Sequence, residues 1–285
     1  MRALEVLATG ALALVQDLGR PGYAHLGVPP SGALDVAALR LANRLAGNAE
    51  SYAGIEAVLG GLSVRATTSC TVAVTGPPVR VQVDGRDVGS HVAVHLRAGQ
   101  TLTIGTPSTG LRCYLAVSGG IAAEPSMGSR SRDVLAEIGP DPLVPGVVLP
   151  LGAVHGIPAG ADVVVPPVAA AELVVPVTLG PRDDWFDDVA RGLGTWWTVT
   201  PESNRVGLRL DGTPLRRAQA YAESELPSEG LLTGAVQVPP NGLPVVFLAD
   251  HPTTGGYPVA ATVRRGSLDA LGQVRPGTKL RFDPS

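Results

Sequence analysis

Residues 71–85 hold two β-branched runs on either side of a turn signal, and they decide the fold class. The sequence there is Thr71-Val72-Ala73-Val74-Thr75-Gly76-Pro77-Pro78-Val79-Arg80-Val81-Gln82-Val83-Asp84-Gly85. Valine that alternates with small or polar residues is typical of a half-buried strand. Gly-Pro and Asp-Gly pairs are typical of the turns that join strands. The stretch therefore predicts two short strands and a mainly β fold.

The same pattern recurs along the whole chain. Glycine (36 residues) and proline (26 residues) are spread through the 285 residues, so they separate many short strands. This spacing favours β-barrels or sandwiches with few helices. Further predicted strands include Ala3–Leu7, Leu12–Gln16, His91–Leu96, Thr101–Ile104, Cys113–Val117, Val163–Val165, Leu173–Leu179, Thr195–Thr200, Gly207–Leu210, Val245–Ala249, Ala260–Arg264 and Thr278–Phe282.

The length predicts two domains, because one domain typically holds roughly 100–200 residues. Residues 166–172 are rich in proline and alanine and lie between two strand-rich halves. We therefore expect an N-terminal β domain at residues 1–170 and a C-terminal β domain at residues 171–285.

Two helices stand out from the strand pattern. The longer is predicted from Ser31 to about Ala46, with apolar residues at helical spacing, Ser31 as its cap and Gly47 at its end. A weaker helix is predicted over Asp183–Arg191, stopped by Gly192.

Charge and hydropathy exclude several classes of protein. A net charge of −3 argues against a broad nucleic-acid surface. No segment has about 20 uninterrupted apolar residues, so no membrane helix is expected, and the N-terminus lacks the pattern of a signal peptide.

Cys70 and Cys113 lie in apolar alternation and are predicted to be buried free thiols of a cytoplasmic protein. The five histidines show no metal-site spacing, so no metal site is expected.

The number of lysines excludes several kinds of nucleotide-binding and lysine-dependent site. Lys279 is the one lysine in the sequence, against 21 arginines. A P-loop needs a Gly-Lys-Ser/Thr triplet, and the sequence has none. If the protein works with ATP or biotin, some of the residues that bind the ATP or carry the biotin should lie on another chain.

The first polar segment lies around the end of a predicted strand. Gln16 and Asp17 are followed by Arg20, close enough for the acid and the base to pair. Ser31 then opens the predicted helix, whose free N–H groups favour an anion. The segment suits a carboxylate- or phosphate-binding corner, or simply a capped helix with a turn-stabilising ion pair.

The second polar segment runs from Gly128 to Asp133 and places Ser129, Arg130 and Ser131 in sequence. Arginine binds carboxylates and phosphates through two parallel hydrogen bonds, and serine hydroxyls adapt to many partners. A site for a small anion and a solvated charged loop are both compatible with this composition.

The third segment holds Ser203, Asn204 and Arg205, with Arg209 further on. Arg205 and Arg209 differ by an even number of residues, so a regular strand would place them on the same side. Surface salt bridging is the alternative to a functional role.

The fourth segment starts at Gln237, in an apolar strand where a buried amide needs partners. Asp250 follows at a strand end, where it could act as a base. His251 and the distant His25 are candidates for proton transfer or rim residues. The following residues have two glycines where backbone can approach a ligand, or form an ordinary turn: Thr253, Thr254, Gly255, Gly256 and Tyr257.

Together these segments resemble the biotin-dependent carboxyltransferase / allophanate hydrolase subunit 2 family, which includes KipA and the C-type subunit of 5-oxoprolinase. One departure is Asp250-His251-Pro252, where the family more usually has Asp-Arg-Gln. The matching motifs span nearly the whole chain: Val15–Gly22, Leu41–Asn48, Tyr114–Ile121, Gly128–Asp133, Ser203–Leu210, Thr253–Pro258 and Gln273–Gly277.

The resemblance implies two cyclophilin-like β-barrel domains and a hetero-oligomer. The partners it implies are a KipI-type protein, which corresponds to the B-type subunit of 5-oxoprolinase, and an A-type subunit of the same enzyme. The activity expected first is ATP-dependent hydrolysis of the cyclic amide 5-oxoproline to glutamate. A lactam is a poor electrophile, and phosphorylation of its oxygen would improve it, so ATP with Mg²⁺ is expected on this chain or on a partner.

Two other functions stay open. One is carboxyl transfer to a urea-type amide, with biotin carried on another chain. The other is a non-catalytic, KipA-like regulator that acts through a KipI-type partner. For the lactam hydrolysis the catalytic candidates are Asp250, Arg205, Asn204 and Ser203. The candidates for binding a substrate or anion are Gln16, Asp17, Arg20, Ser31, Ser129, Arg130, Ser131, Gln237, Thr253, Thr254, Gly255, Gly256 and Tyr257.

Overall fold

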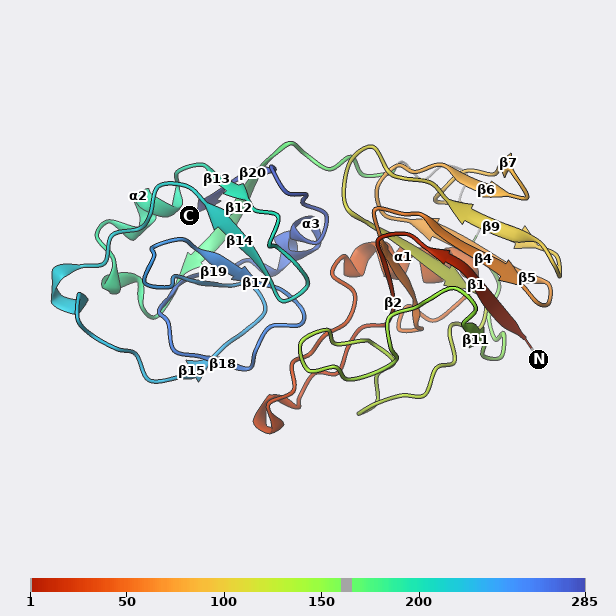
Figure 1. Ribbon diagram of the computed structural model, residues 1–285, viewed down its shortest axis with the longest axis horizontal. Coiled ribbons are helices and arrows are strands. Elements are labelled where there is room, and N and C mark those ends of the chain that lie inside the picture. The colour runs from red at the N-terminus through yellow and green to blue at the C-terminus, as the bar shows by residue number, and fades with distance from the viewer. Residues whose placement is uncertain (1, 160–165, 285) are drawn as a thin grey trace. The chain divides into compact units, whose positions relative to one another are not determined.

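The computed structural model describes residues 2–159 and 166–284, and its fold is mainly β with few short helices, as predicted (Figure 1). The predicted strand Val163–Val165 lies outside the described residues. The chain forms two compact units. Unit 1 is Met1–Arg20, Ser31–Asp133 and Glu137–Ala169, and unit 2 is Pro21–Pro30, Val134–Ala136 and Ala170–Ser285.

Two short segments from the first half of the chain therefore belong to the second unit. These are Pro21–Pro30 and Val134–Ala136. A division of the sequence into two continuous pieces does not anticipate such exchanges, because they depend on contacts between residues far apart in the chain. The boundary between residues 170 and 171 stays a prediction.

Unit 1 is built from two sheets whose strand pairs are all antiparallel (Figure 1). The six-stranded sheet has the order β11 (Val148–Pro150), β1 (Ala3–Thr9), β4 (Leu62–Ala66), β9 (Thr101–Ile104), β6 (Val81–Val83) and β7 (Arg86–Asp87). The five-stranded sheet has the order β2 (Leu12–Gln16), β3 (Gly54–Val58), β10 (Arg112–Val117), β5 (Cys70–Thr75) and β8 (Val94–Leu96).

One apolar core joins these two sheets. It contains Leu4 and Val64 from the six-stranded sheet and Ile55 and Leu115 from the five-stranded sheet, all nearly inaccessible to solvent. Alternate residues of a strand point to opposite faces, so β10 sends Leu115 into this core and Tyr114 to the other face. The five-stranded sheet is therefore covered on both sides.

Both cysteines are buried and free, as predicted. Cys70 and Cys113 belong to the core between the two sheets. Burial raises the pKa of the Cys70 thiol to about 11, and the nearby Arg2 opposes this shift only in part. A thiol in this setting is a packing residue and not a nucleophile.

Helix α1 (Val36–Ala46) covers the outer face of the five-stranded sheet, where Leu39 and Ala42 pack with Tyr114. It begins later than predicted, at Val36 and not at Ser31. The Asp35 side chain caps it by accepting a hydrogen bond from Ala38 N (2.9 Å). Its end at Gly47, in the left-handed conformation, is as predicted.

The predicted role of Ser31 as a helix cap is wrong. Ser31 has a φ of 53° and lies outside the helix. Its hydroxyl donates to the carbonyl oxygen of Arg132 (3.1 Å) instead. The anion-binding helix terminus expected at Ser31 is therefore not formed there.

Unit 2 contains a closed barrel of seven strands. The barrel order is β12 (Glu172–Leu179), β19 (Val259–Val263), β16 (Ala235–Gln237), β17 (Val245–Phe247), β14 (Gly207–Asp211), β13 (Trp197–Val199) and β20 (Lys279–Asp283). The barrel closes through a parallel pairing of β12 with β20, while its other pairs are antiparallel. A two-stranded ribbon joins β15 (Glu229–Gly230) to β18 (Thr254–Gly255).

The second predicted helix is broken into two pieces. A 3₁₀ turn, η2 (Asp183–Trp185), is followed by Phe186 in extended conformation, and α2 (Val189–Leu193) starts afresh after it. Asp188 caps α2, and the helix continues past Gly192 to Leu193, with Gly194 as its C-cap. The remaining short pieces are η1 (Ala24–Leu26), η3 (Gln219–Tyr221), η4 (Arg265–Ser267) and α3 (Leu268–Leu271).

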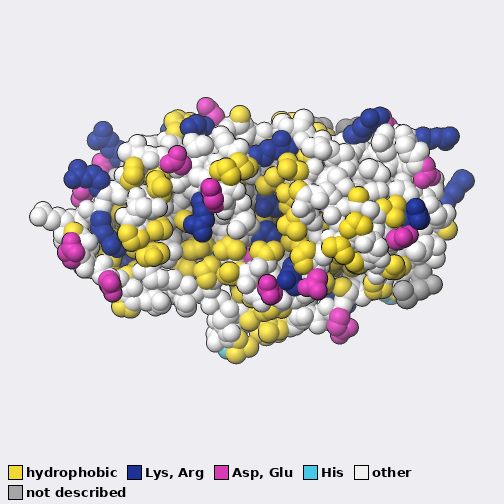
Figure 2. Space-filling model, viewed as in Figure 1, with side chains coloured by type: hydrophobic (Ala, Val, Ile, Leu, Met, Phe, Trp, Pro, Cys, Tyr) yellow, Lys and Arg dark blue, Asp and Glu magenta, His cyan; other side chains and the backbone are white. Residues whose placement is uncertain are grey.

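Among the described residues, no helix combines the length and apolar character needed to span a bilayer. On the face shown in Figure 2, basic and acidic side chains are interspersed and do not form a broad patch of one sign.

The cap of α1 gives a stability prediction. Asp35→Ala removes the acceptor for Ala38 N, and we expect it to lower the free energy of unfolding by about 1 kcal/mol. Asp35→Asn keeps a capping oxygen and should lose less. Urea denaturation of both variants and the parent measures the difference; equal losses in the two variants would contradict a capping role.

Candidate functional site

The Asp17 carboxylate is the centre of a hydrogen-bond network at the end of β2. Its Oδ1 accepts hydrogen bonds from Gly19 N (2.8 Å), Ser129 Oγ (2.6 Å) and Ser131 Oγ (2.6 Å). Its Oδ2 accepts from the backbone N of Arg130 (2.7 Å). A buried carboxylate is costly unless donors satisfy it, so these contacts fix the segment 129–131 beside the end of β2.

The other predicted residues of unit 1 join the same network. Gln16 Nε2 donates to the carbonyl oxygen of Arg132 (2.8 Å), which also accepts from Ser31. Arg20 donates to the carbonyl oxygens of Ser126 and Ser131. The structure thus brings together the first two polar segments, because both Asp17 and Arg20 contact the loop 126–131. The direct pairing of Asp17 with Arg20 stays a prediction.

Arg130 lies at the edge of this network and lines a cavity of about 430 Å³ in unit 1. Its backbone N is held by Asp17, and its Nε donates to the carbonyl oxygen of Ala123 (2.8 Å). Asp17, Tyr52 and His155 line the same cavity. A carboxylate, a guanidinium, a phenol and an imidazole therefore share one concave surface, as is typical of a small-molecule site.

The floor of the cavity depends on glycine. Gly119, with φ of 91°, lies so close to Gly152 that a Cβ on Gly119 would be 2.2 Å from the Gly152 carbonyl oxygen. A Cβ on Gly152 would in turn be 2.4 Å from the Gly119 carbonyl oxygen. A residue with a side chain cannot replace glycine at position 119 or 152 without a shift of the backbone. Glycines of the Tyr114–Ile121 motif therefore shape the cavity.

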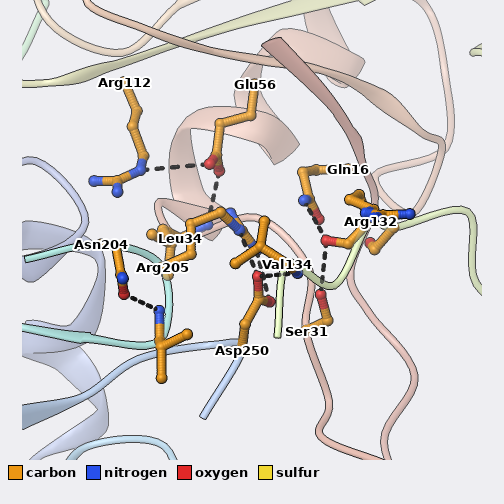
Figure 3. Close-up of polar contacts among 12 residues, drawn as sticks. Gln16, Ser31, Leu34, Glu56, Arg112, Arg132, Val134, Asn204, Arg205 and Asp250 are labelled. Carbon is orange, nitrogen blue, oxygen red and sulfur yellow. Dashed lines mark hydrogen bonds and ion pairs between the residues drawn. The ribbon is translucent and has the colours of Figure 1, made fainter. Parts of the chain in front are cut away.

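The catalytic candidates of unit 2 form a buried ion pair (Figure 3). Asp250 Oδ2 accepts from Arg205 Nε (2.8 Å) and from Val134 N (3.0 Å), and Oδ1 accepts from Arg205 Nη2 (3.0 Å). The exposed fraction is 0% for the Asp250 side chain and 3% for Arg205. This bidentate pair fits a structural role in unit 2, and the catalytic roles given to both residues stay predictions.

Ser203 and Asn204 shape the loop before β14. Asn204 Oδ1 accepts from Val206 N (2.8 Å), and Ser203 Oγ accepts from Arg209 N (3.0 Å). The Asn204 side chain thus binds the backbone of its own loop, and the Ser203 side chain ties that loop to the backbone of β14. The expectation that Arg205 and Arg209 share one side is wrong: Arg205 precedes the strand and is buried, whereas Arg209 is exposed.

The Gln237 amide has the partner that its burial required. Its Nε2 donates to the carbonyl oxygen of Tyr257 (2.9 Å). A Cβ on Gly255 would lie 2.6 Å from Gln237 Nε2. The glycine at position 255 thus allows the close approach of Gln237, while Thr254 and Gly255 pair with β15 and Thr253 accepts a hydrogen bond from Leu231 N (2.9 Å).

The ligand-binding roles expected of Thr253, Thr254, Gly255, Gly256 and Tyr257 stay predictions. A Cβ on Gly256 would meet no atom closer than the Leu226 carbonyl oxygen at 3.4 Å, and the Tyr257 side chain is exposed. The two histidine candidates differ in burial. His251 is buried with Nδ1 2.7 Å from the Pro252 carbonyl oxygen, whereas His25 is exposed with Nδ1 3.1 Å from the Gly22 carbonyl oxygen.

Sequence reasoning missed a second buried polar cluster, in unit 1 around Glu56 (Figure 3). Tyr114 Oη donates to Glu56 Oε2 (2.7 Å), Leu34 N donates to the same oxygen (3.1 Å), and Arg112 Nε lies 3.4 Å from Oε1. Tyr114 Oη also accepts from Asp35 N (2.8 Å). Burial, reinforced by Glu56, raises the pKa of Tyr114 well above its usual value.

One signal in the sequence could have revealed this cluster. Glu56 and Arg112 interrupt two apolar strands, and β3 pairs with β10. A charged residue in an apolar strand needs a partner, but only the pairing shows which residue supplies it. The cluster fixes the segment that leads into α1.

Residues 26–284 match the family model described as carboxyltransferase domain, subdomain A and B. The chain belongs to this carboxyltransferase domain family. The resemblance drawn from the sequence motifs is thereby confirmed.

Relatives of this carboxyltransferase-family chain include proteins named for 5-oxoprolinase and proteins named for urea amidolyase. It is 37% identical to the C subunit of 5-oxoprolinase from Escherichia coli, over 98% of this chain and 90% of that protein. It is 32% identical to urea amidolyase of Saccharomyces cerevisiae, over 99% of this chain but 16% of that protein.

Solved structures agree on the fold. The urea amidolyase of K. lactis superposes with a TM-score of 0.91 at 29% identity, over 98% of this chain and 18% of that chain. TTHA0988 superposes with a TM-score of 0.89 at 34% identity, over 99% of this chain and 56% of that chain. The β architecture is therefore shared by relatives that bear different names.

The Arg205–Asp250 pair gives a second prediction. Arg205→Ala leaves a buried carboxylate without its main partner, so we expect a loss of about 3–5 kcal/mol in the free energy of unfolding. Arg209→Ala, at an exposed arginine in the same segment, should change it by about 0.5 kcal/mol or less. The double variant Arg205→Met/Asp250→Leu should recover part of the loss, because it removes both charges. Equal effects of Arg205→Ala and Arg209→Ala in urea denaturation would show that the buried pair adds little.

Tyr114 gives a prediction with a pH dependence. Tyr114→Phe removes the donor to Glu56 and the acceptor for Asp35 N, which should cost roughly 1–3 kcal/mol at pH 7. The raised pKa keeps Tyr114 neutral in the folded state while an unfolded tyrosine ionises above a pH of about 10. The parent therefore loses stability as pH rises above that point, and the Phe variant is spared this loss. The test is the free energy of unfolding of both proteins at pH 7 and at a pH of about 10.5. A difference in this free energy that does not narrow at the higher pH would contradict the prediction.

Proposed function

We propose that this chain is the C-type subunit of an ATP-dependent 5-oxoprolinase, which opens the lactam of 5-oxoproline to give glutamate. The observation that carries the proposal is the near end-to-end match with the E. coli relative of that name, over 98% of this chain and 90% of that protein. A second relative with the same name, from Haemophilus influenzae, is 32% identical over 98% of this chain.

The cavity of unit 1 supports binding of a small acid. Arg130 offers a guanidinium that can hold a carboxylate through two parallel hydrogen bonds. Asp17 offers an acceptor fixed by four donors. An amide substrate that carries a carboxylate meets a partner for its carboxylate and for its N–H on this surface.

The same cavity offers few groups suited to ATP. A triphosphate needs several cationic groups and Mg²⁺, and Arg130 is the one arginine or lysine that lines the cavity in the described part of the chain. Lys279 is exposed in β20, where its Nζ donates to Thr198 Oγ1 (2.7 Å). Within residues 2–159 and 166–284, no group of three His, Cys, Asp or Glu could hold a metal ion. In this proposal the nucleotide and its Mg²⁺ therefore belong to a partner chain.

The partners in this proposal are a B-type (KipI-like) protein and an A-type protein. The names of the two relatives designate one subunit of a larger enzyme, which supports an assembly with other chains. In this assembly the present chain contributes a substrate-binding surface, and hydrolysis of the lactam is a property of the complex.

A second candidate function is carboxyl transfer from biotin to a urea-type amide. The family model is named for a carboxyltransferase domain, and the urea amidolyase structure superposes with a TM-score of 0.91. In this candidate the biotin is carried on another chain, because Lys279 lies in a barrel strand and not in a biotin-carrier motif.

The proposal predicts glutamate release from 5-oxoproline, with ATP and Mg²⁺, by this chain co-purified with its A-type and B-type partners. Omission of this chain should abolish release, because the chain supplies part of the substrate site. Size-exclusion chromatography should show the three chains as one assembly.

An intact three-chain assembly that releases no glutamate would overturn the proposal. The same preparation is then assayed for transfer of a carboxyl group from carboxybiotin to urea. Activity in that assay would establish the second candidate.

A further inference from the structure

Tyr52 and His155 hold a position in unit 1 that the sequence motifs did not indicate. Both line the cavity of about 430 Å³ beside Arg130 and also a neighbouring cavity of about 400 Å³. The two side chains therefore lie where the two cavities meet. Any ligand that fills the first cavity and extends into the second must pass them.

The polar atoms of these two side chains have unmet hydrogen-bond capacity. Within residues 2–159 and 166–284, neither the Tyr52 hydroxyl nor the His155 ring has a hydrogen-bond partner, and the His155 side chain is exposed to solvent at the rim of both cavities. Tyr52 is only partly exposed, and its ring packs so closely that a Cβ on Gly120 would lie 3.0 Å from it. A phenol fixed by packing, with its hydroxyl unused, is suited to recognise a ligand.

Arg130 and Asp17 supply opposite charges to the first cavity. In the described part of the chain, the Arg130 side chain has one partner, the Ala123 carbonyl oxygen on its Nε, so its two terminal nitrogens are available. Asp17 Oδ2 accepts one hydrogen bond from within the described residues, from Arg130 N, and a carboxylate oxygen can accept two. The cavity therefore matches a ligand with both a carboxylate and an N–H donor.

The second cavity offers less polar recognition. Its Arg44 is paired with Glu50 (2.5 Å), and Asn48 donates to Asn43 Oδ1 (2.9 Å) and to the Val117 carbonyl oxygen (2.8 Å). The rest of its lining is glycine and alanine with Ile157, apart from Tyr52 and His155. Polar ligand groups are thus expected in the first cavity.

We propose that the first cavity binds a small carboxylic acid that carries an amide N–H next to its carboxylate. Arg130 holds the carboxylate, Asp17 accepts the N–H, and Tyr52 and His155 determine which acid is accepted. The identification of 5-oxoproline as that acid rests on the proposed function, whereas the site rests on the cavity and its four side chains.

The test is titration calorimetry of the purified chain alone with three probes. L-5-oxoproline has both the carboxylate and the amide N–H, 2-pyrrolidinone lacks the carboxylate, and N-methyl-5-oxoproline lacks the N–H. We expect the first probe to bind about tenfold or more tightly than either of the others, because each loses one charged or charge-assisted hydrogen bond.

Four variants locate the site. Arg130→Gln should weaken binding of 5-oxoproline about tenfold or more, while its backbone N–H to Asp17 is kept. Tyr52→Phe and His155→Ala should change the ratio of affinities among small acids, because they alter one wall of the cavity. Arg97→Gln, at an exposed arginine of unit 1 outside the cavity, is the matched control and should bind as the parent does. Thermal unfolding confirms that each variant is folded, and Arg130→Lys replaces Arg130→Gln if the latter is not.

The outcomes separate this proposal from the proposed function. Binding of another N–H-bearing acid, such as an N-acylamino acid, that depends on Arg130 while 5-oxoproline does not bind would sustain the site and count against the 5-oxoprolinase assignment. No binding of any such acid, or binding that Arg130→Gln leaves unchanged, would overturn the site, even if the three-chain assembly releases glutamate.

Discussion

The Asp17 carboxylate is the interaction on which the candidate site of unit 1 depends. A buried carboxylate needs donors, and four donors from two distant parts of the sequence converge on it. This convergence ties the end of β2 to the loop 128–132. Because the backbone N of Arg130 is one of the donors, the position from which its guanidinium reaches the cavity is set by the same network.

The Arg205–Asp250 pair and the cavity of unit 1 differ in how far their polar groups are already paired. The Arg205–Asp250 pair is buried, and its atoms meet partners inside unit 2. The cavity side chains of unit 1 keep hydrogen-bond capacity for a ligand. Binding requires groups whose partners are absent from the folded chain, which is why the substrate is proposed in the cavity and not at Asp250, one of the four catalytic candidates from the sequence.

Family membership constrains the fold of this chain more than its substrate. Relatives named for 5-oxoprolinase and for urea amidolyase both match nearly the whole chain. A shared β architecture can support different chemistry, because chemistry depends on a few side chains placed on it. The substrate therefore has to be decided by the side chains of the binding site and not by the fold.

The sequence by itself determined the mainly β fold, the two buried thiols and the end of α1 at Gly47, because alternation, burial preference and turn residues are local properties. It also indicated the two polar segments that meet at Asp17. Only the tertiary structure decided that Asp35 and not Ser31 caps α1 and that Arg205 is bound by Asp250. It also decided that Tyr52 and His155 share a cavity with Arg130. These features depend on which distant segments pack together, and that pairing leaves no periodic signal in any one segment.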